Sequence, residues 1–407
     1  MPTPTLTDRD TLLEAVRAAG LLSLEQQRKA DAVAPTGPAL DAAHALVAAG
    51  LLTRFQADRL LADRTDGFHL GPYVILDQIG RGSMSRVYKA RHRIMNRSVA
   101  VKVLSAELTR TAEARELFRR EVRSAGRLSH PNIVTAYDAN ELNDRFYLVL
   151  EFVDGPSLDA LVRQRGPLPV DEACEFVRQI AHGLKHAHEL GMVHRDLKPA
   201  NVLVARPTPY APPTVKIADF GIPRISPGAA VYLAPEQLHD PHAADGRADL
   251  FSLGCVFHFL LTGRPAGEAP RVERPDVRPE IAAIVRRLLA THPAGRFASA
   301  AELLAHLDAA CVPGAMPMDG VDFDMPPARP YTPDSGYLIG RHAEPSPWAQ
   351  LTDEIATDPT TTDTPAPPPK ALGRGEPVPL WMTAALLVGA VALCMTGIAA
   401  VVRLMVK

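Results

Sequence analysis

The spacing of apolar and polar residues predicts a small all-helical module at the start of the chain. The segment Val16–Ser23 recurs thirty positions later as Leu46–Thr53, and a helical pattern that contains glutamine follows each copy. The glycine of each copy suits the left-handed residue that ends a helix, and its Ser or Thr suits the cap that begins the next helix. We therefore expect two helical hairpins within residues 1–67, which act either as a module that binds a protein partner or as a brace for the next domain.

From Tyr73 the pattern changes to the period of two that is typical of β-strands, with one helix expected at residues 112–128. Beyond residue 153 it turns helical, and we expect Asp171 to cap a long amphipathic helix. Strands are predicted at residues 99–103, 146–153, 202–204 and 215–217. A strand-rich part is therefore followed by a part that is mainly helical.

The last hundred residues have two different patterns. Residues 311–379 are rich in Pro, Asp and Thr and almost lack apolar periodicity, which predicts a disordered linker. The 23 residues 380–402 carry no charge, and Trp381 lies near their start. About 20 apolar residues span the roughly 30 Å of bilayer hydrocarbon as a helix, and aromatic residues favour its interface. We expect one transmembrane helix in contact with membrane lipid; a buried core helix is the alternative.

Charge and cysteine content narrow the classes of function. The net charge is −2, from 44 basic and 46 acidic residues, so no excess of positive charge favours nucleic acid as a partner. No pair of cysteines has the C-x-x-C spacing of metal or redox sites, and we expect reduced thiols. The cysteines are Cys174, Cys255, Cys311 and Cys394.

One polar stretch, residues 194–201 (His-Arg-Asp-Leu-Lys-Pro-Ala-Asn), carries the candidate chemistry. We expect Asp196 to accept the proton of an attacking hydroxyl and Lys198 to neutralise charge on a transferred phosphoryl group. Asn201 is expected to hold a magnesium ion. These are the groups that phosphoryl transfer needs near one loop, whereas the alternative interpretation is a solvated polar loop.

Two further features are weak by themselves. Gly80 and Gly82 allow the backbone to approach phosphates, but Ser85 stands where a third glycine is usual, and the strand pattern after them disfavours a Rossmann fold. Lys102 lies within an apolar strand, where a lysine is more often an edge residue that prevents aggregation than a catalytic group.

The stretch 194–201 resembles the catalytic loop of protein kinases, and further motifs follow in the order typical of that family. They include Asp219-Phe220-Gly221, Ala234-Pro235-Glu236 and Arg296. The resemblance covers residues 71–310 and is to the Hanks-type serine/threonine kinases of bacteria. It implies an α+β, bilobal protein kinase fold, with a β-rich small lobe and an α-rich large lobe.

The same resemblance implies the roles of site residues. Lys102 would hold the α- and β-phosphates and be oriented by a helix glutamate, for which we choose Glu121; Asp219 would be the second magnesium ligand. The implied cosubstrate is ATP with Mg2+, which Mn2+ can replace. The nucleotide-contacting residues are expected to be Ile79, Gly80, Gly82, Val87, Ala100, Lys102, Glu151, Val153 and Leu203.

The chain departs from the family pattern on the side that would bind a peptide. Only 12 residues, 222–233, lie between Gly221 and Ala234, which is short for an activation segment, and Ala229 replaces the usual threonine. A second shortening, to the eight residues 266–273, predicts the loss of most of one large-lobe helix.

Two functions are consistent with the sequence. The first is a membrane-tethered serine/threonine kinase that transfers the γ-phosphoryl group of Mg-ATP to protein hydroxyls. The alternative is a nucleotide-binding pseudokinase scaffold, because both departures fall on the peptide side. Residues 1–20 lack a continuous apolar stretch, so no secretory signal is expected. Since ATP is cytoplasmic, we expect a single-pass protein with its kinase domain in the cytoplasm.

Overall fold

The computed structural model describes residues 7–82, 85–106, 110–142, 145–205, 211–220, 229–239, 244–267 and 272–311. The predicted linker beyond Cys311, the predicted transmembrane segment 380–402 and most of the short segment 222–233 lie outside these residues. Within the described part of the chain, no helix combines the length and the apolar character needed to cross a bilayer.

The first helices form the module that the repeat predicts. Gly20 and Gly50 have φ angles of 62° and 68°, so both adopt the left-handed conformation that ends a helix. Ser23 and Thr53 accept hydrogen bonds from the backbone amides of the glutamines three residues later. The helices are α1 (Arg9–Ala18), α2 (Leu24–Val33), α3 (Ala39–Ala48) and α4 (Arg54–Leu61). Their alanine-rich faces pack around Leu12, Leu46 and Leu60, which are fully buried.

The module is attached to the strand-rich part through α4. The buried Gln56 donates from Nε2 to the carbonyl oxygen of Ile75 at 2.8 Å, and the Thr53 hydroxyl donates to the carbonyl oxygen of Leu76. Phe55 packs against the apolar cluster on that side of the sheet. These contacts favour the brace interpretation of residues 1–67.

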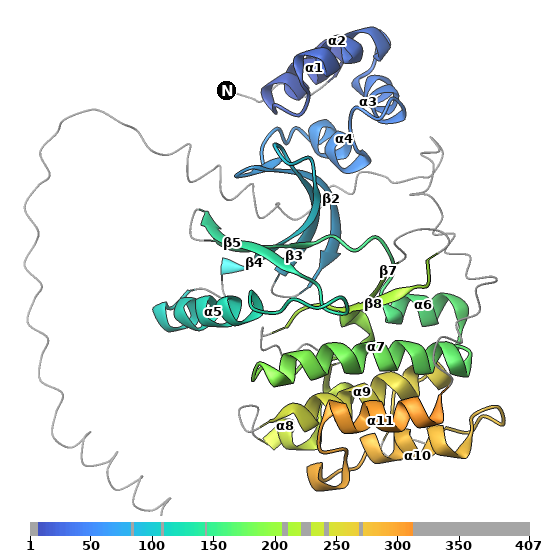
Figure 1. The fold of residues 1–407 in the computed structure, drawn as a ribbon. Helices are drawn as coiled ribbons and strands as arrows, with labels where there is room; N and C mark the ends of the chain where they lie inside the picture. Colours follow the sequence, from blue (N-terminus) through green and yellow to red (C-terminus); the bar gives the residue numbers. More distant parts are fainter. Residues whose placement is uncertain are drawn as a thin grey trace, which may run out of the picture. The chain divides into compact units, whose positions relative to one another are not determined.

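The small lobe is one antiparallel sheet in the order β1-β2-β3-β4-β6-β5, with helix α5 (Ala112–Ala125) beside it (Figure 1). Phe118 of α5 contacts Phe146, with ring centroids 5.0 Å apart. All residues of α5 are described, and none of them is buried. The strands are β1 (His69–Leu70), β2 (Tyr73–Arg81), β3 (Ser85–His92), β4 (Ser98–Leu104), β5 (Ala136–Leu142) and β6 (Arg145–Glu151).

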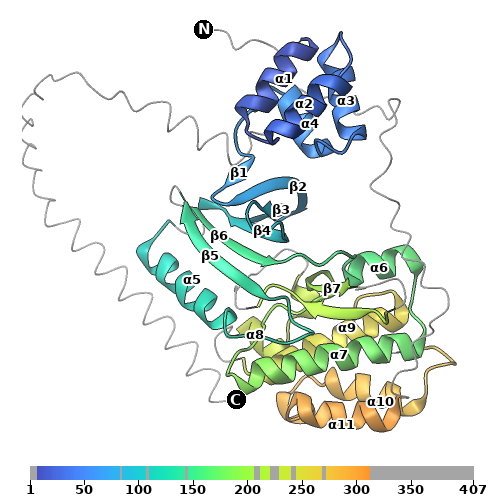
Figure 2. The ribbon, with the colours of Figure 1, turned by 45° about the horizontal axis from the view of Figure 1, so that its top comes forward.

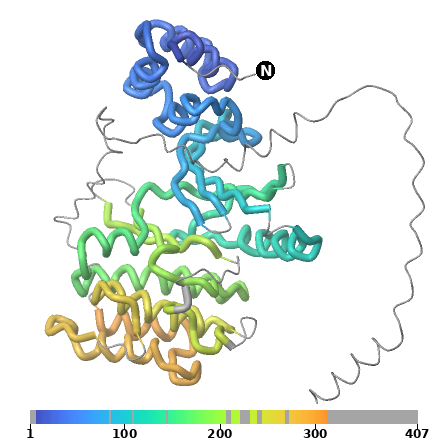
Figure 3. The backbone as a smooth tube through the Cα atoms, turned by 180° about the vertical axis from the view of Figure 1, so that it is seen from behind, coloured from blue at the N-terminus to red at the C-terminus, as the bar shows by residue number. Residues whose placement is uncertain are grey.

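The large lobe is a stack of helices with a small hairpin on top (Figure 2). The antiparallel hairpin β7–β8 packs on α7, and α7 packs on both α9 and α11. Figure 3 shows the same helices from behind, with the last helices of the described chain in orange. Its elements are α6 (Leu158–Arg165), α7 (Val170–Glu189), β7 (Val202–Ala205), β8 (Thr214–Ile217), α8 (Pro235–His239), α9 (Gly246–Thr262), α10 (Pro279–Leu288) and α11 (Ala300–Ala310).

Two details bear on the sequence predictions. The expected cap of the long helix is wrong, because α7 begins at Val170 with Pro169 before it. Asp171 therefore lies inside the first turn, where its negative charge interacts favourably with the helix dipole. The predicted loss of a large-lobe helix falls between α9 and α10, where residues 268–271 lie outside the described part of the chain. The described residues between α9 and α10, 263–267 and 272–278, contain no helix.

Candidate active site

A buried carboxylate on α9 holds the loop that carries the candidate chemistry. Asp249 is fully buried and accepts hydrogen bonds from the backbone amides of His194 and Arg195, each at 2.8 Å. The ring Nε2 of His188 lies 2.8 Å from the same carboxylate. Burial by itself would raise the pKa of Asp249, but the bond to His188 and the nearby histidine charges outweigh it and leave this pKa below its ordinary value.

The three polar residues of the loop form one hydrogen-bonded group. The ammonium of Lys198 lies 2.8 and 3.0 Å from the two carboxylate oxygens of Asp196. The amide of Asn201 donates to the backbone carbonyl of Asp196 at 2.8 Å and to its carboxylate at 3.2 Å. Asp196 is only 6% exposed, so these bonds fix the direction of its carboxylate. A solvated polar loop does not have this arrangement.

Two residues beside this group have strained backbones. Arg195 and Asp219 have φ angles of 67° and 68°, a region that residues other than glycine rarely adopt. His194 joins the two segments, since its Nε2 lies 2.9 Å from the carbonyl oxygen of Ala218, and its ring packs at a steep angle against that of Phe220, with the ring centroids 4.6 Å apart. Such strain at two adjoining loops is typical of a functional site.

Lys102 lies in the interior between the two lobes and forms an ion pair with the carboxylate of Asp219. Glu121, which the sequence predicts as the lysine's partner, lines the same cavity on α5. Among the described residues it forms no ion pair. The structure thus brings Lys102, Glu121 and Asp219 together but pairs the lysine with the aspartate.

The other predicted nucleotide contacts lie along the strands next to Lys102. The strand register places Gly80 opposite Val87, Val87 opposite Lys102, and Ala100 opposite Leu150. Ile79, also on β2, is 47% exposed. The sequence-predicted glycine strands and the lysine strand are therefore neighbours in one sheet.

The segment after β6 connects the lobes. Glu151 pairs with Lys216 at 3.1 Å, and Val153 follows it in the connection. An added Cβ at Gly155 would lie 1.9 Å from the carbonyl oxygen of Val204, so only glycine fits where the connection passes β7. This close approach places Leu203 beside the connection, and Leu203 also bridges to Ser157.

The oxygen donors present fit a magnesium ion held together with a nucleotide. The side-chain nitrogen of Asn201 donates to Asp196, so the amide oxygen of Asn201 can face a cation. Asp219 supplies a carboxylate. Mg2+ prefers such oxygen ligands and is usually bound by one or two carboxylates plus phosphates. Where the structure describes the chain, no cluster of three or more His, Cys, Asp or Glu side chains is suited to a metal. A metal here would therefore share phosphate ligands.

The sequence was compared with models of known protein families. The family described as "Protein kinase domain" matches residues 73–306, which is more than half of the chain. The chain belongs to the protein kinase family. The bilobal fold predicted from the catalytic loop is thereby confirmed.

Several bacterial kinases are similar to this chain. Serine/threonine-protein kinase PknB of Mycobacterium leprae is 37% identical over 268 residues, which cover 58% of this chain and 42% of that protein. PknD of Mycobacterium tuberculosis is 37% identical over 266 residues, which cover 58% of this chain and 39% of that protein. The crystal structure of the M. tuberculosis PknI kinase domain has a TM-score of 0.53 and 31% identity, and it covers 60% of this chain and 98% of that one. The chain thus matches about two-fifths of the length of these two curated relatives.

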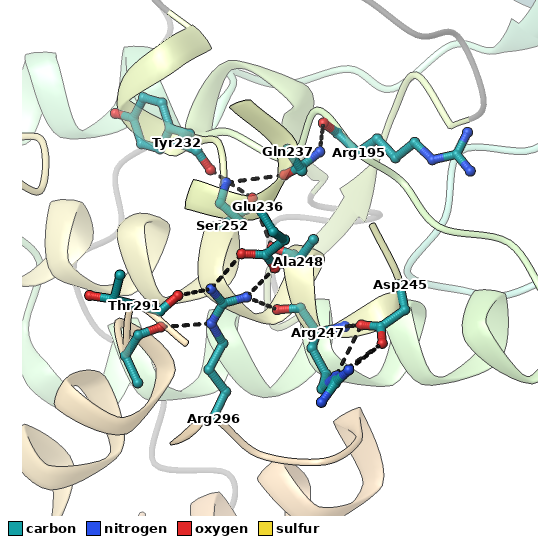
Figure 4. A network of polar contacts seen from close by, with 12 residues as sticks. Arg195, Tyr232, Glu236, Gln237, Asp245, Arg247, Ala248, Ser252, Thr291 and Arg296 are labelled. Atoms are coloured by element: carbon teal, nitrogen blue, oxygen red, sulfur yellow. Dashed lines mark hydrogen bonds and ion pairs between the residues drawn. The ribbon is translucent and has the colours of Figure 1, made fainter. Parts of the chain in front are cut away.

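Figure 4 shows the contacts that support the substrate side of the kinase domain. Arg296 pairs with Glu236 at 2.6 and 2.8 Å and also donates to backbone carbonyls, including that of Thr291. Ser252 of α9 donates to the carbonyl oxygen of Tyr232 at 2.7 Å. These bonds hold α8 and the turn before it against α9 and the segment before α11.

Sequence reasoning missed Gln237, the residue after Glu236. Gln237 is 6% exposed; it donates to the carbonyl oxygen of Arg195 at 3.0 Å and accepts from the amide of Ala234 at 3.1 Å. It therefore joins α8 to the backbone of the catalytic loop. The sequence shows only that a glutamine follows Ala234-Pro235-Glu236; the burial and the hydrogen bonds of Gln237 come from the structure.

Proposed function

We propose that this protein is an active serine/threonine protein kinase that transfers the γ-phosphoryl group of ATP to hydroxyl groups of proteins. The observation that carries the proposal is the buried Asp196, which is held by the buried Asn201 and the half-buried Lys198. A scaffold that only bound nucleotide would not need a carboxylate held in place by both an ammonium and an amide. The serine/threonine names of the similar bacterial kinases also support it.

The chemistry follows from the residues present. Asp196 accepts the proton of the attacking hydroxyl, and Lys198 reduces the negative charge near the transferred group. Asn201 and Asp219 would hold Mg2+, which neutralises phosphate charge when it is bound. Lys102 would bind the phosphates from the small lobe, because its ammonium is directed to the same place as Asp219.

A nucleotide-binding pseudokinase scaffold is the alternative that the sequence leaves open, and the similarity to proteins named serine/threonine-protein kinases does not favour it. Two features are the reason to test it. Lys102 pairs with Asp219 instead of Glu121, so binding of Mg-ATP would have to compete with that ion pair. The segment 222–233 is also short, and Ala229 lacks the hydroxyl that usually joins it to the catalytic loop.

Asp196→Asn separates the two candidates. We expect wild-type protein with Mg-ATP to phosphorylate itself or a basic test protein, and the variant to lose at least about 100-fold of this rate, since proton transfer to a positioned base contributes that much or more. ATP should raise the thermal unfolding temperature of both proteins alike. Equal rates in the two proteins, or no transfer by wild type while ATP still stabilises it, would contradict the kinase proposal.

We further propose that residues 380–402 anchor the protein in a membrane, with the kinase domain in the cytoplasm. The support is the sequence itself: 23 residues without charge, an aromatic residue near one end, and Arg403 and Lys407 after the other. A membrane tether would place the kinase near substrates at the cytoplasmic surface.

A further inference from the structure

The turn between β3 and β4 (residues 93–97) exposes two adjacent apolar side chains. Ile94 is 89% exposed and Met95 is 67% exposed. Among the described residues, no other large apolar side chain is as exposed as Ile94. Single exposed apolar residues are common on protein surfaces, so the surroundings of this pair decide whether it has a function.

The backbone of the turn is held in one conformation. The amide of Met95 donates to Nδ1 of His92 at 3.1 Å, and the amide of Asn96 donates to the carbonyl oxygen of His92 at 2.9 Å. Asn96 has a φ angle of 51°, a left-handed conformation that asparagine adopts more readily than most residues. The His92 ring packs against Tyr73, with the ring centroids 5.2 Å apart. A fixed turn therefore presents the two apolar side chains to solvent.

Basic and aromatic side chains surround this apolar tip. Arg91, Arg93 and Arg97 are all exposed, and none of them forms an ion pair with a carboxylate of the described residues. The guanidinium of Arg97 lies over the ring of Tyr137, 3.9 Å from its centre, and Tyr137 is 36% exposed. No residue from 91 to 98 is acidic. Asp138, which follows Tyr137, is the one carboxylate beside these residues in the sequence, so positive charge remains in excess.

We propose that the β3–β4 turn is a docking site for the surface of a lipid bilayer that contains anionic lipids. Basic side chains bind anionic headgroups, and tyrosine favours the interface between headgroups and hydrocarbon. Apolar side chains beside them enter the boundary between headgroups and acyl chains. The arginines, Tyr137 and the Ile94–Met95 tip match these three layers in chemistry.

The small size of the apolar tip favours lipid over other anionic partners. Nucleic acid presents phosphates, but its backbone has no apolar layer that would cover Ile94. A specific protein partner typically covers about 800 Å² on each side, which is far more than one turn offers. A bilayer accepts a narrow apolar tip because its acyl chains rearrange around it. The turn lies in the small lobe, so this contact is separate from the anchor proposed for residues 380–402.

Oxidation of Met95 measures whether the turn is covered. The full chain is reconstituted into nanodiscs of phosphatidylcholine with or without phosphatidylglycerol, and a brief exposure to hydrogen peroxide converts accessible methionine to its sulfoxide. Mass spectrometry of peptides then gives the rate at Met95. We expect this rate to be at least about fivefold lower with phosphatidylglycerol, which is the effect of one arginine near an anionic surface. High salt should remove most of the difference, since it screens the attraction.

Equal rates in the two nanodiscs would overturn the proposal. The outcome for the anchor is separate, because a chain that failed to stay in phosphatidylcholine nanodiscs would still show protection by phosphatidylglycerol. Protection of Met95 by RNA or by polyglutamate, without protection by phosphatidylglycerol, would assign the turn to another class of partner and would also overturn the proposal.

Two pairs of variants separate charge from apolar contact while Met95 stays as the reporter. Arg93→Glu should lose most of the protection, whereas Arg286→Glu, at an exposed arginine of α10, should keep it. Ile94→Ser should weaken the protection, whereas Leu24→Ser, at a side chain of α2 that is 78% exposed, should not. All four positions are exposed, so the variants should fold like the wild type. Full protection in Ile94→Ser would contradict insertion of the apolar tip.

Discussion

Single buried polar residues determine where the reactive groups of this kinase domain lie. A buried carboxylate is costly unless hydrogen bonds compensate for the water it loses. Asp249 meets this condition by accepting two backbone amides of the catalytic loop and contacting His188. The stability of the large lobe and the shape of the catalytic loop are thereby coupled through one side chain.

Asp249→Asn tests this coupling. The side-chain amide of the variant has no charge and one acceptor oxygen, so it accepts fewer of the hydrogen bonds that Asp249 accepts. Charge-assisted hydrogen bonds contribute about 1.5–3 kcal/mol each. We therefore expect the free energy of unfolding at pH 7 to fall by about 2 kcal/mol or more. The pKa of Asp249 is lowered in the folded protein, so its stabilising effect is present above the ordinary aspartate value of 3.8 and is lost as pH falls through the lower folded pKa.

Urea unfolding of both proteins across a pH series measures this difference. The difference in free energy of unfolding between wild type and Asp249→Asn should stay constant from pH 7 to about pH 5. It should become smaller below the ordinary aspartate pKa of 3.8. Asp276→Asn, at an exposed carboxylate paired with Arg274, is the control and should show a much smaller gap. A gap that widens on acidification would contradict the sign of the shift.

At the scale of elements, the two helical hairpins offer an internal comparison. Gln26 and Gln56 occupy equivalent positions, and the side-chain oxygen of each accepts the backbone amide of its cap residue, Ser23 or Thr53. Only Gln56 also donates to β2, through the carbonyl oxygen of Ile75. The difference between the two glutamines therefore isolates one contact between the module and the small lobe.

We expect Gln56→Ala to lower the free energy of unfolding by about 1–3 kcal/mol more than Gln26→Ala, because it leaves a buried carbonyl without its partner. Hydrogen exchange should show faster opening of β2 in the first variant only. If both variants had the same effect, helix capping alone would explain it, and α4 would not brace the kinase domain.

The helix α8 and the catalytic loop are the second pair of elements whose contact can be tested. Gln237→Leu removes both hydrogen bonds of that side chain while keeping its approximate volume. We expect kcat for a protein substrate to fall roughly tenfold, about 1.4 kcal/mol, with KM for ATP nearly unchanged. The neighbouring Leu238→Gln, at a side chain that is 62% exposed, is the control and should behave as wild type. Loss of ATP binding in Gln237→Leu would point to a general structural defect.

At the scale of the whole molecule, the attachment to a membrane stays a prediction, because residues 380–402 lie outside the described part of the chain. Deleting residues 380–407 should move the protein from the membrane fraction to the soluble fraction of cells, since it removes 23 consecutive uncharged residues. Protease added outside intact cells should leave the kinase domain uncut. A full-length protein that was already soluble, or a kinase domain cut from outside, would contradict the proposed topology.

Local patterns in the sequence determined the features that depend on neighbouring residues. The glycines and caps at Gly20, Ser23, Gly50 and Thr53 predicted the helical hairpins because a helix end is fixed by the residues of its last turn and its cap. The catalytic loop was recognisable for the same reason, since Asp196, Lys198 and Asn201 lie within six positions.

Only the tertiary structure decided which distant residues meet. Lys102 and Asp219 are 117 positions apart, and their ion pair depends on how the lobes and α5 are placed, which no local pattern encodes. Gln237 reaches Arg195 across 42 positions, because α8 packs beside the catalytic loop. Side-chain chemistry and local backbone preference act over a few residues, whereas these contacts arise from the packing of whole helices and strands around a common core.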